Sequence, residues 1–305
     1  PCCISTFLSV YLCYYGFIAV HIEPFQSCAD MLKRGFEIGL SAGDTQTSLI
    51  CGIQYIQKSL VSGMNLSSLK KESDYQMRLI DSHSQLSKMY MTAWQDIIST
   101  LIGGGLSNSI RSDADVSRVR EFSETVVFHG VLQHFWLGHY DRCIYYAEKS
   151  SPLSDIGKLK SVMILFYGGV SCFHTRNKFT ASSKLKKFAR HAMRVMEDKG
   201  AISSWNYENK IHLLNAEFFS ATGKKDQAKV SYNAAISAAR SAKFVHEQGL
   251  ACELAALHCI KHGDNDDASN LLKEARKCYT NWGSEVKVAS ITRQLENIIG
   301  SQDER

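Results

Sequence analysis

The sequence predicts an all-α chain, a right-handed α-solenoid built from stacked helical hairpins. The first observation is a pattern that returns after forty residues, since the segment from Gly223 to Ala228 is followed in the same style by Gly263 to Ala268. The second is that only three prolines occur in 305 residues, so long helices can run almost anywhere. A repeat of this period is typical of stacked-hairpin arrays.

The register that follows each alanine supports a helix. Small, large and small side chains recur at spacings of four and three, which places them on one helix face. The glycine five residues before each alanine fits the turn that closes the preceding helix, where a positive φ is often needed. The two stripes are Ala228, Tyr232 and Ala235, then Ala268, Leu272 and Ala275. We expect all four alanines to be buried where helices cross closely.

Two more copies of the pattern lie upstream. The segment from Gly138 to Cys143 is followed by Ala147 and Ser150 in the same register. A weaker copy opens at Gly43-Asp44 and continues to Ser48 and Gly52. The array is therefore expected to extend over most of the chain.

Helical periodicity predicts paired helices along the whole sequence. The expected pairs are 4–22 with 25–42, 45–62 with 72–102, 119–137 with 141–150, 157–174 with 183–198, 205–221 with 225–241, and 246–261 with 266–280, before a last helix at 284–299. Three consecutive glycines from position 103 break this pattern and begin a polar stretch.

These breaks suggest a division of the chain into four parts. We predict degenerate helical repeats at 1–105, a polar loop or hinge at 106–118, regular repeats at 119–283, and a C-terminal helix with a polar tail at 284–305. The last helix carries an apolar seam from Val288 to Ile298. We expect it to cap the array, with a connector to a further domain as the alternative.

The turns resemble those of the tetratricopeptide repeat, in a version longer than its usual period. The stretch 205–283 is more specifically similar to the helical region of large multidomain signalling proteins. In that family the region lies between an AAA-type ATPase, often with a kinase-like domain before it, and GAF or histidine-kinase modules after it. The resemblance implies an interaction or linker role. The family's ATP-binding and phosphoryl-transfer motifs do not occur in this sequence.

The N-terminal segment 4–22 carries no charged side chain and is long enough to span a bilayer. It contains several polar residues and has no basic flank, so we expect a buried helix pair, with a membrane or targeting segment as the alternative. The ten cysteines occur mainly at single helix-face positions, which favours small apolar packing in a reduced, cytoplasmic chain.

Few residues suggest chemistry. His258 and His262 have the i, i+4 spacing of zinc ligands, but no third ligand follows at a set spacing, and we expect a partly exposed helix end there. His129, His134 and His139 recur every five residues, which spreads them around a helix. We therefore expect no catalytic residue, no cofactor and no metal site. A hydrolase site built from scattered histidines and cysteines stays open as an alternative.

One charged feature is distinctive. Between residues 156 and 196 there are nine lysines and arginines and no carboxylate. On a helix over 183–198, the apolar side chains share one arc and the cations face away from it. The predicted partner-binding basic face is Lys184, Lys187, Arg190 and Arg194.

The sequence as a whole predicts a non-catalytic protein-interaction and linker scaffold, part of a larger signalling ATPase or kinase. Its partner is expected to be a flanking domain or an acidic protein. We expect neither nucleic acid nor membrane as a partner. The alternative is an adaptor whose basic patch binds an acidic partner or nucleic acid.

Overall fold

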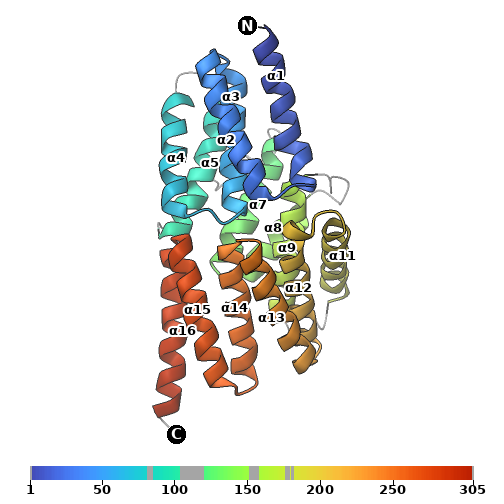
Figure 1. Ribbon diagram of the computed structural model, residues 1–305. Coiled ribbons are helices and arrows are strands. Elements are labelled where there is room, and N and C mark those ends of the chain that lie inside the picture. Colours follow the sequence, from blue (N-terminus) through green and yellow to red (C-terminus); the bar gives the residue numbers. More distant parts are fainter. Residues whose placement is uncertain are drawn as a thin grey trace.

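A computed structural model describes residues 2–80, 85–103, 120–150, 158–175, 179 and 182–303. The described part of the chain contains fourteen α-helices and no β-strand. Consecutive helices pack against each other as hairpins (Figure 1). The predicted all-α array of stacked hairpins is confirmed.

The first half of the chain forms the upper part of Figure 1. Its helices are α1 (Cys2–Cys13), α2 (Phe25–Ala42), α3 (Thr45–Val61), α4 (Leu66–Ile80) and α5 (Gln85–Ile102). The expected helix at 72–102 is wrong, because two helices occupy this region and the first of them begins at Leu66. The expected loop at 106–118 lies outside the described residues.

The second half of the chain continues the array. Its helices are α7 (Arg120–Trp136), α8 (Tyr140–Lys149), α9 (Leu159–His174), α11 (Ser183–Gly200), α12 (Ser204–Ala221), α13 (Lys225–Ser241), α14 (Val245–Lys261), α15 (Asn265–Trp282) and α16 (Glu285–Asp303). All of these lie within two residues of the predicted limits, except that α16 runs further at its C-terminal end.

The segment 4–22, predicted as one helix, changes its helix type along its length. After α1 the backbone forms a π-helical turn over Tyr14–Ile18 and a 3-10 turn over Ala19–His21. Gly16 lies in the π turn, and its carbonyl accepts a hydrogen bond from Lys58 Nζ at 2.8 Å. No helix among the described residues is long and apolar enough to cross a bilayer.

The repeated glycines close four hairpins with the same turn. Gly43, Gly138, Gly223 and Gly263 have φ between 76° and 81°. In each turn the next residue donates its N–H to a carbonyl five positions back, as Asp264 does to Cys259 at 3.0 Å. A Cβ at any of the four would meet no atom within 4 Å. Glycine is therefore favoured at these turns by the positive φ of the backbone. It is not favoured by a lack of space for a side chain.

The predicted stripe of small residues is buried. Ala228, Ala235, Ala268 and Ala275 have no exposed surface. Upstream copies behave in the same way, since Ser48 is also fully buried and a Cβ at Gly39 would lie only 2.7 Å from its Cβ. The helices of each hairpin cross closely at these points, which confirms the register.

The two halves of the chain meet end to end. Asn206 at the start of α12 accepts a hydrogen bond from the backbone N–H of Phe25 at 3.1 Å and donates one to the carbonyl of Glu23 at 2.7 Å. Ser284, just before α16, donates to the carbonyl of Leu101 at 2.7 Å. Figure 1 shows the resulting arrangement, with α4 and α5 above α15 and α16.

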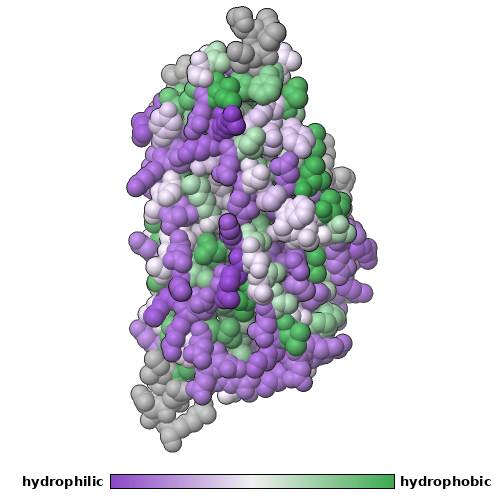
Figure 2. All heavy atoms as spheres, in the orientation of Figure 1, coloured by the Kyte–Doolittle hydropathy of each residue, from purple (hydrophilic) through white to green (hydrophobic). Residues whose placement is uncertain are grey.

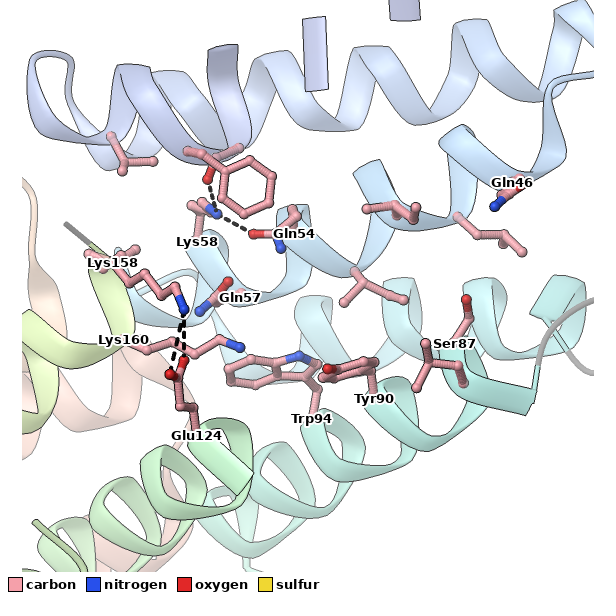
Figure 3. A pocket seen from close by; sticks show the side chains of 18 of the residues that line it. Gln46, Gln54, Gln57, Lys58, Ser87, Tyr90, Trp94, Glu124, Lys158 and Lys160 are labelled. Atoms are coloured by element: carbon pink, nitrogen blue, oxygen red, sulfur yellow. Dashed lines mark hydrogen bonds and ion pairs between the residues drawn. The ribbon is translucent and has the colours of Figure 1, made fainter. Parts of the chain in front are cut away.

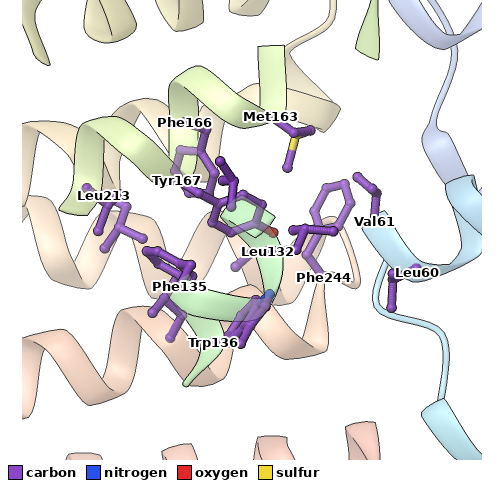
Figure 4. Close-up of a cluster of buried hydrophobic side chains, with 14 of the residues drawn as sticks. Leu60, Val61, Leu132, Phe135, Trp136, Met163, Phe166, Tyr167, Leu213 and Phe244 are labelled. Carbon is purple, nitrogen blue, oxygen red and sulfur yellow. The ribbon is translucent and has the colours of Figure 1, made fainter. Parts of the chain in front are cut away.

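Aromatic side chains fill the junction between the halves. Figure 4 shows Trp136 and Phe135 of α7 beside Tyr167 of α9, with Leu60 and Val61 of α3 nearby. The ring centroids of Trp136 and Trp282 lie 4.8 Å apart, which joins α7 to α15. The eight cysteines from Cys13 to Cys278 are free thiols, and all of these but Cys13 are buried. The hydrophobic core therefore runs through both halves without a break.

The surface differs between the halves. Figure 2 shows hydrophilic side chains over most of the lower helices and more apolar surface in the upper part. The region of α1 and the two turns after it contributes several exposed apolar side chains, namely Phe7, Val10, Phe17, Ile18 and Ile22.

Candidate functional site

The predicted basic face lies on α11. The side chain of Ser182 caps this helix by accepting the N–H of Leu185 at 3.3 Å. The apolar arc of the helix packs inward, and its members Leu185, Ala189, Ala192, Val195 and Met196 are buried. The opposite side exposes the four predicted cations Lys184, Lys187, Arg190 and Arg194.

The ion pairs of the basic face are at the surface. Lys184 Nζ lies 2.9 Å from Glu148 Oε2 of α8, but the lysine side chain is 74% exposed. Arg190 donates from Nε to the carbonyl of Lys186 at 3.2 Å. Exposed pairs of this kind contribute little to stability. The face therefore has four accessible cations on one rigid helix.

Two other cations of the basic stretch, Lys158 and Lys160, contact α7 instead. Arg176 and Lys178 lie outside the described residues. Lys158, just before α9, pairs with Glu124 of α7 at 3.3 Å, and Lys160 of α9 donates to Thr125 Oγ1 at 2.7 Å. These two lysines line a cavity that the sequence did not predict.

The cavity lies between α3 and α5 and has a volume of about 940 Å³. Figure 3 shows Lys58, Gln57 and Gln54 on its α3 wall, Trp94 and Tyr90 on its α5 wall, and Lys158 and Lys160 at one end. The π turn contributes Gly16 and Phe17. Gln46 and Ser87 lie at the opposite end (Figure 3). The described lining carries three lysines and a single carboxylate, Glu124.

Lys58 is the most unusual residue of this cavity. Its side chain is almost completely buried, and its ammonium donates to the carbonyl of Gly16 and to Gln54 Oε1. No carboxylate of the described residues forms an ion pair with it. Burial, and secondly repulsion by Lys160, lowers the pKa of Lys58 to about 7.

Two further polar side chains near the cavity are strongly buried. Gln57 is 3% exposed, and its side-chain amide makes no hydrogen bond to another described residue. His129 packs its ring against Trp94 at 4.4 Å, and neither ring nitrogen has a described partner. Burial, and secondly Lys160, lowers the pKa of His129 to about 3, so this imidazole is neutral at physiological pH.

The predicted partly exposed helix end is correct for His262, the half-buried C-cap residue of α14, and wrong for His258. His258 is 3% exposed and not at an exposed helix end, because it lies against α12, where Ser220 Oγ is 2.9 Å from its Nδ1. A hollow of about 350 Å³ lies beside it and is lined by Tyr232 and Cys259 among others. Burial, as the largest effect, raises the pKa of the Cys259 thiol. Within the described ranges, no group of three side chains has the geometry of a metal site.

The three histidines spaced five apart do not all stay separate. Helix α7 ends at Trp136, and the Gly138 turn brings His139 back beside His134, with their Nδ1 atoms 3.5 Å apart. The expected spread assumed one continuous helix and is wrong for this pair. His129 lies elsewhere, against Trp94.

Buried ion pairs between helices are the features that sequence reasoning missed. Lys210 of α12 pairs with Glu247 of α14 at 2.7 Å, and Lys287 of α16 pairs with Glu253 of α14 at 2.7 Å. Tyr279 also donates to Glu253, at 2.6 Å. Burial, followed by the charge of Glu253, raises the pKa of Tyr279. These groups pair with each other and connect four helices, α12, α14, α15 and α16.

No protein-family model matches this chain, and no curated protein matches it either. What the fold defines is a class, an all-α array of stacked helical hairpins. The basic face of α11 and the cavity between α3 and α5 are its two candidate functional features.

Proposed function

We propose that this chain is a non-catalytic, tetratricopeptide-type scaffold that binds an acidic protein partner through the basic face of α11. One observation carries the proposal. Lys184, Lys187, Arg190 and Arg194 are all exposed on one helix whose apolar arc is buried. A rigid row of cations attracts and orients a negatively charged surface.

The resemblance of 205–283 to the helical region of signalling ATPases and kinases supports a linker role within a larger cytoplasmic protein. Hairpin arrays couple each repeat to its neighbours, so they can transmit strain between flanking domains. The end-to-end contacts of Asn206 with Glu23, and of Ser284 with Leu101, connect distant parts of this array. A movement at one end is thereby linked to the other.

A binding experiment distinguishes an acidic protein partner from the nucleic-acid alternative. Each of two probes, an aspartate- and glutamate-rich peptide and a random-sequence duplex DNA, is titrated into the protein at two salt concentrations. The test variant replaces Lys184, Lys187, Arg190 and Arg194 by glutamine. The control variant replaces four exposed cations elsewhere by glutamine: Lys243, Lys273, Arg276 and Lys277.

We expect the acidic peptide to bind the wild type and the control variant, and to lose at least tenfold in affinity for the α11 variant. Affinity should also fall as salt rises, because exposed charges are screened. Equal loss in both variants would show that net charge matters and the α11 face does not. Tighter binding of duplex DNA with the same dependence on α11 would favour the nucleic-acid adaptor.

A further inference from the structure

We propose that the cavity between α3 and α5 is a binding site for a small amphipathic carboxylate. Its carboxylate would lie at the lysine-rich end, near Lys58 and Gln57. Its apolar body would lie along α3, over the rings of Trp94 and Tyr90. This inference is independent of the basic face on α11.

The size and lining of the cavity suit a small molecule. A volume of about 940 Å³ is within the range of ligand pockets, which are mostly apolar with a few polar groups that set orientation. Leu49, Ile50 and Ile53 line the α3 wall between Gln46 and Gln54. The helix therefore presents an apolar stretch before it reaches its polar end.

The charged side chains described at the polar end are mostly lysines. Lys58, Lys158 and Lys160 line it, and the only described carboxylate in the lining, Glu124, already pairs with Lys158. In Figure 3 the side chains of Lys58, Gln57, Lys158 and Lys160 gather at this end. An anion placed there would offset the mutual repulsion of the lysines.

Lys58 has capacity for a ligand. An ammonium has three N–H donors, and two of them are used by Gly16 and Gln54, which are both neutral acceptors. A buried cation without a counter-charge is costly, and such groups are enriched at functional sites. The lowered pKa of Lys58 is consistent with this cost. A bound carboxylate would supply the missing charge.

Gln57 is a second, independent indication. Its side chain lines the cavity and is 3% exposed, and no hydrogen bond joins its amide to a described residue. In Figure 3 it lies between Lys58 and Lys160. Its amide would donate to one carboxylate oxygen, while Lys58 would donate to the other.

Matched probes test whether the ligand is a carboxylate with an apolar body. Decanoate, its neutral counterpart decanol, 3-phenylpropionate and inorganic phosphate are each titrated by calorimetry, with the intrinsic tryptophan fluorescence, to which Trp94 contributes, as a second signal. We expect at least one of the two carboxylates to bind, and to bind at least tenfold more tightly than decanol or phosphate.

Three variants locate the binding. Lys58→Met removes the charge and keeps the length of the side chain, and we expect at least a tenfold loss of carboxylate affinity. Ile53→Trp fills the apolar stretch without changing any charge, so it should also weaken binding. If Lys58→Met is poorly folded, Ile53→Trp still tests the location of the site. Lys71→Met, at an exposed position on α4 outside the cavity, should bind like the wild type.

Several results would overturn the proposal. Equal binding of decanoate and decanol would show that the cations play no part, and tighter binding of phosphate would assign a different ligand class. Unchanged affinity in both Lys58→Met and Ile53→Trp would place the site elsewhere. Failure of both carboxylates to bind the wild type at millimolar concentration would reject the site itself.

Discussion

Lys210 Nζ lies 2.7 Å from Glu247 Oε2, and neither side chain has any exposed surface. The lysine also donates to the carbonyl of Asn206 at 2.9 Å and lies over the ring of Phe244. Asn209 donates to the same carboxylate oxygen. Every charge in this group is therefore compensated, although the surroundings are apolar. The pair joins α12 to α14 at the level where the two halves of the chain meet.

Breaking this pair should be strongly destabilising. Lys210→Met leaves Glu247 buried without its counter-charge, so we expect a loss of about 3–5 kcal/mol in the free energy of unfolding, measured with urea. The double variant Lys210→Met, Glu247→Leu should recover much of that loss. Lys229→Met, which removes the exposed pair with Asp267, should stay near the wild type. Additive single and double effects would contradict the coupling.

The small-residue register can be tested by enlarging one side chain. Ala268 is fully buried where α15 crosses its neighbour, so Ala268→Leu should destabilise the protein by about 1–3 kcal/mol through overpacking. Lys273→Leu, on the exposed side of the same helix, is the control. Equal stability of the two variants in urea unfolding would show that the crossing tolerates a larger side chain.

Much of the fold could be predicted because its turns have local signals. The four glycines at positive φ repeat in sequence, and each is followed by its buried small residue. Lys243 shows the limit of this reasoning. It has φ 61° and makes an equivalent turn before α14, but a lysine gives no sign of that conformation. The split between α4 and α5 was missed for a related reason, since no glycine or proline marks it.

The basic face could be predicted from one helix, and the cavity could not. The spacing of the cations along α11 places them on one side of the helix, so local periodicity is sufficient to predict the basic face. The cavity combines Lys58 of α3, Trp94 of α5 and Lys160 of α9, which are far apart in the sequence. The buried partners Lys210 and Glu247 come from α12 and α14, which are separated in the sequence by the whole of α13. Only the tertiary packing brings such residues together.

The C-terminal helix should stabilise the array on which it packs. Ile291, Leu295 and Ile298 are buried, and Lys287 pairs with Glu253 of α14. Truncation after Gly283 would expose these surfaces and leave Glu253 without its cation. We expect a fall in Tm of several degrees or more. Removal of residues 301–305 alone is the control. An unchanged Tm after the longer truncation would favour the connector role.

Stability at acid pH should depend on His129. Its pKa is lowered from 6.5 to about 3 in the folded chain, chiefly by burial and secondly by Lys160. Between these two values the unfolded chain binds more protons than the folded chain, so the contribution of His129 to stability decreases as pH falls from about 6.5 towards 3. At pH 5 this loss should be roughly 2 kcal/mol relative to pH 7 and above.

The variant His129→Phe isolates this effect. Phenylalanine keeps an aromatic ring against Trp94 and removes two ring nitrogens that have no described partner. We expect the variant to be about 1 kcal/mol more stable at pH 7, because buried polar groups without hydrogen bonds are costly. Its advantage over the wild type should grow as the pH of urea unfolding is lowered to 5. An advantage that stays constant between pH 7 and pH 5 would show that His129 is not held neutral in the folded chain.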